Sequence, residues 1–472
     1  MAPATTSSSS SSTISSPLQA GADQLLAAEL RSIAESFAIP DEQLAKISGR
    51  MEAEMFRSLA RGAGSELHMA ASAVRACSGP DNGVALGMAI EASGRRIRIG
   101  SVRFAAGAIA GSHTHVFPAP AAATQRELFD FAASCLREFI QAEGLEGSGQ
   151  PLPLGVTVAL PVDSGAAADD ACSAAKEEPA LLRGCDVAQR MRDAVLRSHL
   201  PVRVASVTNN VVSALAAARF HDGTARVAAA LNRGINAAYF EDAAQISSSS
   251  SSGSGPEDAA GDVAVNTEIG CFGSATNALP LTMWDHRVDR ESRAPHTRCL
   301  EKLVAGQYLG EIVRNLVTDL VDRRLLFAAG YDPRPISTPY AFHSAYMAPI
   351  IEDASPDLSF VAALLATEFG VRSSLADRRA VRALCRIVAD RAARLAGALL
   401  AALVLKASGH ARRDVAVCLT GALLETNEHI RDMAVSTMHA LLAQKRAATA
   451  SVHFQPRADD LIGAAVTAAQ AS

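Results

Sequence analysis

Residues 204–220 read VASVTNNVVSALAAARF, and residues 227–240 read VAAALNRGINAAYF. The first stretch predicts a strand that ends in the polar residues 208–210, followed by a helix of small apolar residues. The second stretch predicts a strand that ends in Asn-Arg-Gly at 232–234. Ligands bind at the carboxyl ends of strands in α/β folds, so we expect the ligand site to lie where these two strands end.

Length and composition indicate a soluble globular protein with two large domains. The chain has 472 residues, of which 49% are hydrophobic and 20% are charged. Its formal net charge of -5 gives no reason to expect nucleic acid or a membrane as a partner. The eight cysteines form no C-x-x-C pair, so we expect reduced thiols, no zinc site and a cytoplasmic location, with nuclear access left open.

Three segments are set apart by composition. Residues 1–21 form a serine-rich tail that we expect to be disordered, because it lacks the basic start and apolar core of a secretory signal. A second Ser/Gly tract at 245–257 predicts a surface loop. The apolar run at 395–405 is too short to span a bilayer and predicts a buried helix.

The stretch with which we began resembles the hexokinase family, in its fungal hexokinase and glucokinase-like form. In that family an Asn-Asp-Thr segment carries the catalytic Asp, and a Gly-Thr-Gly loop one strand later holds the ATP phosphates. Asn209 and Asn210 stand at the first of these positions here, and residues 232–234 stand at the second.

The resemblance runs from about residue 23 to residue 469, and it implies a fold as well as a site. The implied fold class is α/β, of the actin-like ATPase (ribonuclease H-like) type, with two lobes around a cleft. N-terminal helices and the small lobe would take residues 22–210, and the large lobe would take residues 211–472. The C-terminal helix at 459–469 would return to the small lobe.

The resemblance also implies a sugar site. Residues 263–273, VAVNTEIGCFG, are similar to the family segment Ile-Asn-x-Glu-Trp-Gly-x-Phe-Gly, and residues 300–310, LEKLVAGQYLG, match a second segment. An ionised glutamate suits this task because it accepts hydrogen bonds from two neighbouring hydroxyls. Each residue taken alone could be an ordinary surface residue, whereas their joint order favours the site. The implied sugar-binding residues are Lys176, Asn209, Asn236, Glu268 and Glu301.

The implied nucleotide-phosphate residues are Gly94, Gly234 and Gly421. Gly94 is the part left unchanged of the family's Asp-Leu-Gly-Gly-Thr-Asn hairpin, and Thr-Gly-Ala at 420–422 replaces Asp-Gly-Ser. Glycines let backbone amides approach phosphates closely, so the altered loops predict a weakened ATP cradle. The arginines at 95 and 96 are typical of a solvated turn, although they could instead attract an anion.

Asn210 stands where the catalytic Asp is expected. Phosphoryl transfer to a sugar hydroxyl needs a carboxylate that accepts the hydroxyl proton, and an amide has no useful basicity. The resemblance therefore implies a catalytically impaired hexokinase-like protein, similar to the non-catalytic regulators of this family. Such a protein would act as a sugar-binding regulator or sensor of a hexose or amino sugar, and could have a regulatory protein partner.

Two other functions stay open at this point. The chain could be an active hexose or N-acetylglucosamine kinase that uses ATP and Mg²⁺, with Asp163 as a relocated base. It could also be a scaffold that binds neither sugar nor ATP. Ala159 and Ala175 replace a Ser and a Thr that contact the sugar in the family, so the preferred sugar is not set. Residues 113–115, His-Thr-His, have no third ligand nearby, and we expect no metal there.

Overall fold

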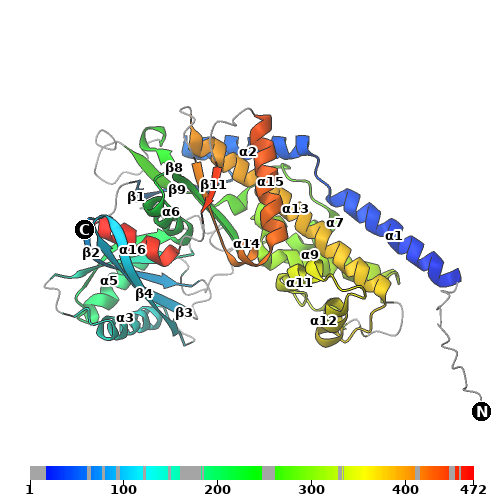
Figure 1. Cartoon of the computed structure of the whole chain (residues 1–472), viewed down its shortest axis with the longest axis horizontal. Coiled ribbons are helices and arrows are strands. Elements are labelled where there is room, and N and C mark those ends of the chain that lie inside the picture. Colours follow the sequence, from blue (N-terminus) through cyan, green and yellow to red (C-terminus); the bar gives the residue numbers. More distant parts are fainter. Residues whose placement is uncertain are drawn as a thin grey trace, which may run out of the picture.

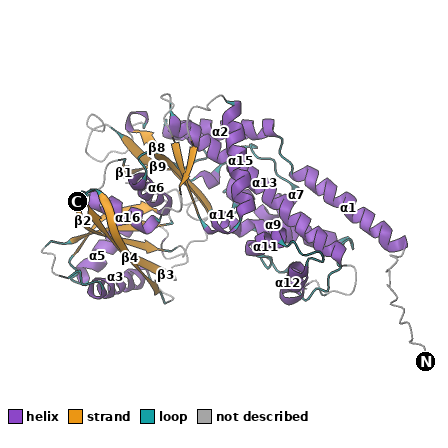
Figure 2. Cartoon of the chain, viewed as in Figure 1, coloured by secondary structure: helices purple, strands orange, loops and turns teal. Residues whose placement is uncertain are grey.

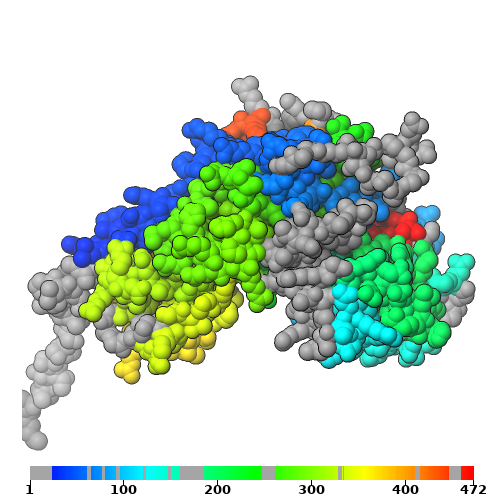
Figure 3. All heavy atoms as spheres, turned by 180° about the vertical axis from the view of Figure 1, so that it is seen from behind, coloured from blue at the N-terminus to red at the C-terminus, as the bar shows by residue number. Residues whose placement is uncertain are grey.

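The computed structural model describes residues 17–60, 65–76, 80–91, 96–120, 124–146, 150–159, 182, 185–246, 261–327, 332, 334–409, 415–445, 452–455 and 459–471. These residues form two lobes, each built on one mixed sheet (Figures 1 and 2). Seen from behind, the two lobes form separate bulges of the surface (Figure 3).

A five-stranded sheet forms the first lobe, in the order β4-β3-β2-β5-β6. Strand β3 pairs antiparallel with β4 on one side and with β2 on the other. Strand β5 pairs parallel with β2 and with β6. Alternate residues of β2 face opposite sides, so Leu86 and Met88 pack on α3 and α5 while Ala85 faces α16. The elements of this lobe are β2 (Asn82–Ile90), β3 (Arg96–Ala105), β4 (Ala108–Pro118), α3 (Gln125–Ala142), β5 (Leu152–Val158), α5 (Val187–Arg197), β6 (Val202–Asn209) and α16 (Asp460–Gln470).

A six-stranded sheet forms the second lobe, in the order β1-β9-β8-β7-β10-β11. Helix α6 covers one face of this sheet through its small apolar residues, and the helices around α13 cover the other. The strands and the helix on the first face are β1 (Ala70–Arg75), α6 (Asn210–His221), β7 (Ala225–Leu231), β8 (Ile235–Asp242), β9 (Asp262–Asn266), β10 (Val415–Thr420) and β11 (Val452–Gln455).

The large helical layer is arranged around α13, whose apolar residues recur over its whole length. No helix among the described residues is long and apolar enough to cross a membrane. The remaining α-helices are α1 (Pro17–Phe37), α2 (Asp41–Leu59), α7 (Met283–Glu291), α8 (Cys299–Val304), α9 (Gly306–Asp322), α10 (Arg334–Ser337), α11 (Met347–Glu352), α12 (Ser359–Phe369), α13 (Leu375–Ser408), α14 (Ala422–Thr426) and α15 (Glu428–Gln444), and the short 3-10 helices are η2 (Ala243–Gln245), η4 (Ile269–Cys271) and η5 (Ser344–Tyr346).

The N-terminal segment differs from the sequence expectation in two ways. Helix α1 begins at Pro17, inside the tail predicted at 1–21, because proline is well suited to the first turn of a helix. Helices α1 and α2 pack on α13 of the second lobe, and β1 pairs with β9, although the sequence had grouped them with the small lobe. Residues 1–16 and 247–260, which hold most of both serine tracts, lie outside the described residues.

Three glycines form a row across the five-stranded sheet, where the C-terminal helix α16 crosses it. Gly87 lies opposite Gly100 in β3 and opposite Gly155 in β5. A Cβ at Gly87 would lie 2.2 Å from the Leu461 carbonyl oxygen, and a Cβ at Gly155 would lie 1.9 Å from that of Ala464. The backbone of α16 therefore touches the sheet directly, which a side chain at these positions would prevent.

The opposite side of α16 meets α6 just as closely. A Cβ at Gly463 would lie 1.7 Å from the carbonyl oxygen of Ser213 in α6. Ser206 of β6 and Thr467 of α16 are joined by a hydrogen bond of 2.9 Å. Helix α16 thus fixes the distance between the first sheet and α6, the helix that begins at Asn210.

We expect Gly155→Ala to lower the free energy of unfolding by about 1–3 kcal/mol or more, because the added methyl group overlaps the backbone of α16. Gly111→Ala is the matched control, since no atom lies within 4 Å of a Cβ at this position of the same sheet. Urea unfolding of both variants measures the difference. Equal stability of the two variants would mean that α16 does not rest on the glycine row.

Candidate functional site

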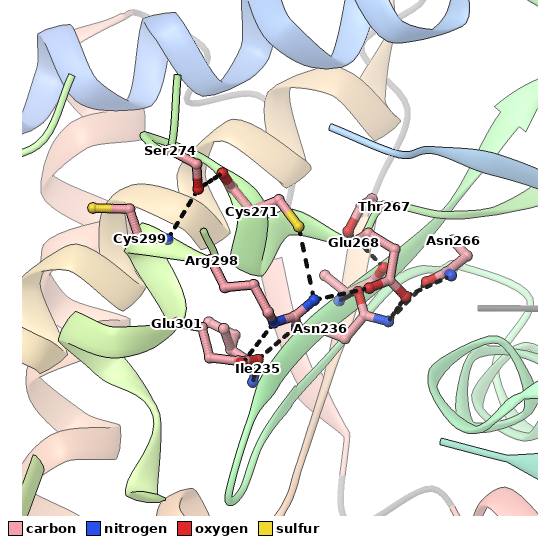
Figure 4. A network of polar contacts seen from close by, with 11 residues as sticks. Ile235, Asn236, Asn266, Thr267, Glu268, Cys271, Ser274, Arg298, Cys299 and Glu301 are labelled. Atoms are coloured by element: carbon pink, nitrogen blue, oxygen red, sulfur yellow. Dashed lines mark hydrogen bonds and ion pairs between the residues drawn. The ribbon is translucent and has the colours of Figure 1, made fainter. Parts of the chain in front are cut away.

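Glu268 lies at the end of β9, buried to 0% exposure, in the left-handed conformation with φ of 48°. Its Oε1 accepts hydrogen bonds from the side-chain amides of Asn236, at 3.2 Å, and Asn266, at 3.0 Å (Figure 4). The Asn236 amide also donates to Asn266 Oδ1 at 2.8 Å. Asn236 of β8 and Asn266 of the neighbouring strand β9 therefore orient this carboxylate.

Glu301 of α8 lies on the other side of the same group of residues and is 5% exposed. The Arg298 guanidinium donates to it twice, from Nε to Oε1 and from Nη2 to Oε2, each at 2.7 Å. The Ile235 amide donates to Glu301 Oε2 at 3.1 Å. Such a two-point contact between guanidinium and carboxylate is the most directional ion pair that side chains form.

Arg298 joins the two glutamates (Figure 4). Its Nη1 lies 3.5 Å from Glu268 Oε2 and 3.7 Å from the Cys271 sulfur. Burial alone would lower the pKa of Arg298, but the charges of Glu301 and Glu268 raise it well above its usual value. The guanidinium is therefore charged at every physiological pH, and we name Glu268, Glu301, Arg298, Asn236 and Asn266 the carboxylate cluster.

The structure brings together three of the predicted sugar-binding residues, Asn236, Glu268 and Glu301. All three are buried, so the interpretation of them as ordinary surface residues is wrong. Sequence reasoning missed Arg298 and Asn266. Arg298 lies three residues before Glu301, a spacing at which an ion pair on one face of a helical turn could have been suspected.

Asn209 and Asn210 stand at the junction of β6 and α6. The Asn209 side chain caps the helix, because its Oδ1 accepts a hydrogen bond of 2.9 Å from the Val211 amide. Asn210 is the first residue of α6 and is half-buried. Since α6 packs against β8 and β9, the junction and the carboxylate cluster are held by elements in direct contact.

A cavity of about 510 Å³ lies beside the cluster, on the second lobe. The turn after β7 and the start of α14 line it, through Asn232, Arg233 and Ala422. The two predicted phosphate loops at 232–234 and 420–422 therefore share one cavity. The other lining residues are Gly306, Gln307, Tyr340, Phe342, His343, Ser344, Ala345, Ala348, Leu423, Thr426 and Asn427.

Close backbone contacts shape this cavity and connect it to the cluster. A Cβ at Gly234 would lie 2.9 Å from Glu301 Oε2, so the turn after β7 rests on the carboxylate. Gly421 has a φ of 107°, and a Cβ there would lie 2.3 Å from the Leu231 carbonyl oxygen. Both predicted glycines are thus required by the packing of the turns, whatever else they contact.

Several predicted site residues fall elsewhere. Lys176, Gly94, Asp163 and Ala175 lie outside the described residues. Ala159 directly follows β5. His113 and His115 lie on the edge strand β4, where both face the Glu143 carboxylate, at 3.4 and 3.1 Å. Among the described residues, no group of three or more His, Cys, Asp or Glu side chains is placed to hold a metal ion.

We expect Glu301→Gln to lower the free energy of unfolding by about 3–5 kcal/mol, because it leaves the buried Arg298 without its main counter-charge. Glu42→Gln is the control, since the Glu42–Lys46 pair is exposed to solvent and such pairs contribute little to stability. Thermal or urea unfolding separates the two. A loss at Glu301 no larger than that at Glu42 would contradict the assignment of a buried pair.

Comparison with known proteins identifies the whole chain. Two family models described as hexokinase match it, over residues 29–220 and residues 226–470. Hexokinase-1 of rice, Oryza sativa subsp. japonica, is 34% identical over 471 residues, which cover 95% of this chain and 91% of that protein. Hexokinase-2 of Candida albicans is 28% identical over 391 residues, with 81% and 80% covered.

Solved structures show the same fold. A hexokinase from Schistosoma mansoni complexed with glucose superposes with a TM-score of 0.81 at 24% identity, over 95% of this chain and 99% of that one. A second hexokinase crystal structure gives a TM-score of 0.76 at 22% identity, over 95% and 100%. The prediction of a two-lobed α/β fold of the actin-like type is confirmed. With both halves of the sequence matched in order, this chain belongs to the hexokinase family.

Proposed function

We propose that this hexokinase-family chain binds a hexose at the carboxylate cluster, transfers a phosphoryl group to it slowly or not at all, and acts as a sugar-responsive regulator. The observation that carries the proposal is the amide at residue 210. Asn210 begins α6 at the strand end where the family resemblance places the catalytic carboxylate.

The chemistry of an amide supports slow transfer. A sugar hydroxyl attacks the terminal phosphate of ATP only as its proton leaves, and a positioned carboxylate is the group that accepts this proton. The Asn210 amide can exchange hydrogen bonds with a hydroxyl but cannot take the proton. Absence of a general base costs about 10² to 10⁴ in rate.

The carboxylate cluster supports binding of a polyhydroxy ligand. Glu268 and Glu301 offer carboxyl oxygens as acceptors, and Asn236 and Asn266 add amide groups that both donate and accept. Buried polar groups of this density distinguish a hydroxyl from a methyl group, because a missing partner leaves one of them unsatisfied. A hexose matches this requirement, and a relative of the same fold is complexed with glucose.

The second lobe retains a place for a nucleotide. The cavity of about 510 Å³ is large enough for part of ATP, and Arg233 supplies a positive charge at its lining for the phosphates. The turn at 232–234 and the start of α14 would hold the nucleotide. Bound ATP would supply the phosphoryl group, and Mg²⁺ carried by its phosphates would neutralise their charge. The described residues of the chain would contribute orientation and exclusion of water.

This cavity also favours a second candidate function, that of an active ATP-dependent hexose or N-acetylglucosamine kinase. The altered phosphate loops at 232–234 and 420–422 line a cavity rather than closing it. The relatives at 34% and 28% identity are named hexokinases, which adds to this candidate. It requires a base other than Asn210, and Asp163 stays the candidate by sequence.

A coupled assay that follows ADP release separates the two functions. With glucose, mannose or N-acetylglucosamine as acceptor, we expect turnover by the native chain close to the rate without sugar. We expect Asn210→Asp to raise it by about 10² to 10⁴-fold, because it restores a carboxylate at the start of α6. Asn210→Ala serves as the control that removes the amide without adding a base.

Robust turnover by the native chain would reject the proposed function in favour of the active kinase. If Asn210→Asp gained nothing although calorimetry showed bound ATP and bound sugar, the missing base would not be the cause of low activity. A chain that bound neither ligand would be a scaffold. Titration with sugar alone therefore accompanies the assay.

A further inference from the structure

We infer that Arg298 is an internal competitor of the sugar: its guanidinium occupies the two carboxylates that the sugar hydroxyls need, and so sets the affinity of the site. This inference rests on the proposed sugar site and concerns a residue that the sequence did not single out. We call the contacts of Arg298 with Glu301 and Glu268 the arginine latch.

The latch supplies two of the three hydrogen bonds that Glu301 accepts, and it places a positive charge beside Glu268. Glu301 Oε1 receives Arg298 Nε, and Glu301 Oε2 receives both Arg298 Nη2 and the Ile235 amide. Glu268 Oε1 receives two asparagine amides, and Oε2 faces Arg298 Nη1 at 3.5 Å. Because a carboxylate has about four acceptor sites, a sugar that donates two hydroxyls to Glu301 must displace one of its three donors.

The guanidinium is held in this place by its surroundings. Arg298 is 1% exposed and has a φ of 51° just before α8 begins. A Cβ at Gly270 would lie 3.0 Å from its Nη2, so the glycine gives the guanidinium the room it needs. A burial this complete means that Arg298 cannot serve a ligand as a second binding group without leaving the carboxylates.

The backbone around Arg298 is tethered on both sides. Lys302 donates to the Ala294 carbonyl oxygen at 2.7 Å, and the Cys299 amide donates to Ser274 Oγ at 3.1 Å. The His296 amide donates to both oxygens of Asp289, at 3.0 and 3.1 Å. Release of the latch is therefore a rotation of the Arg298 side chain, and the loop before α8 can stay in place.

Opposite effects on affinity and stability follow from this arrangement. A neutral hexose must replace a buried pair of full charges, so the native chain binds hexoses weakly. Removal of the guanidinium frees the carboxylates for the sugar but leaves them without a counter-charge, which destabilises the fold. A residue with a purely structural role would lower stability and affinity together.

The test is calorimetric titration of the full chain and of Arg298→Gln with glucose, mannose and N-acetylglucosamine, together with thermal unfolding. We expect Arg298→Gln to bind at least one of these sugars about tenfold more tightly or better, and to melt at a lower temperature. Each sugar should also raise the melting temperature of the variant more than that of the native chain, because ligand that binds the folded state stabilises it.

Arg391→Gln is the matched control. Arg391 is equally buried and makes a two-point pair with Asp285, at 2.6 and 2.7 Å, away from the carboxylate cluster. We expect this variant to lose stability without a gain in sugar affinity. Arg298→Lys keeps the charge but cannot form the two-point contact, and should gain less affinity than Arg298→Gln.

A folded Arg298→Gln that bound every sugar no better than the native chain would overturn the latch. If this variant did not fold, the test would be an NMR titration of the native chain with the same sugars, following the ¹⁵N resonance of Arg298 Nε. We expect the resonance to shift as the sugar displaces the carboxylate, and sugar binding without a shift would also overturn the latch. Robust phosphorylation by the native chain would reject the proposed function alone, since affinity and turnover are measured separately.

Discussion

The direct contact of the α16 backbone with Gly87 and Gly155 is the constraint on which the arrangement of the first lobe depends. It lets the last helix of the chain lie directly on strands that come much earlier in the sequence. Helix α6 packs against the other side of α16 at Gly463. Because protein interiors are close-packed, a single methyl group at this contact has to move a whole helix. The packing of α16 between the sheet and α6 also fixes the position of Asn209 and Asn210, since α6 begins there.

The second lobe follows a different constraint, that buried charges are paired. Arg298 with Glu301, Arg391 with Asp285 and Arg314 with Glu311 are two-point pairs inside the helical layer. Lys406 of α13 and Glu241 of β8 form a buried pair where α13 packs on the six-stranded sheet. Desolvation of an ion costs several kcal/mol, and an opposite charge with good geometry offsets it. Of these pairs, Arg298 with Glu301 is the one that a sugar would have to separate in the proposed function.

A site built in this way links binding to conformation. In the proposed site, ligand hydroxyls and the Arg298 guanidinium would compete for the same oxygens, so the position of Arg298 would report the occupancy of the site. A regulator uses such a difference between two states, because a ligand shifts an equilibrium only as far as its affinities for the states differ. The amide at Asn210 fits the same picture, since a hydroxyl held without a base stays unreacted.

The sequence by itself determined the local elements and the family. Apolar patterns predicted the strand and helix within 204–220, the strand that ends at 232–234 and the buried helix at 395–405, because these patterns depend on neighbours along the chain. The common site of Asn236, Glu268 and Glu301 was implied only by the resemblance of their segments, in order, to the hexokinase family. Only the tertiary structure decided that α1 and α2 pack on α13, that Gly87, Gly100 and Gly155 form a row, and that Arg298 reaches Glu268 thirty residues earlier in the chain. Those facts depend on which surfaces meet after folding, and a side chain's partner across such a contact leaves no pattern in its own stretch of sequence.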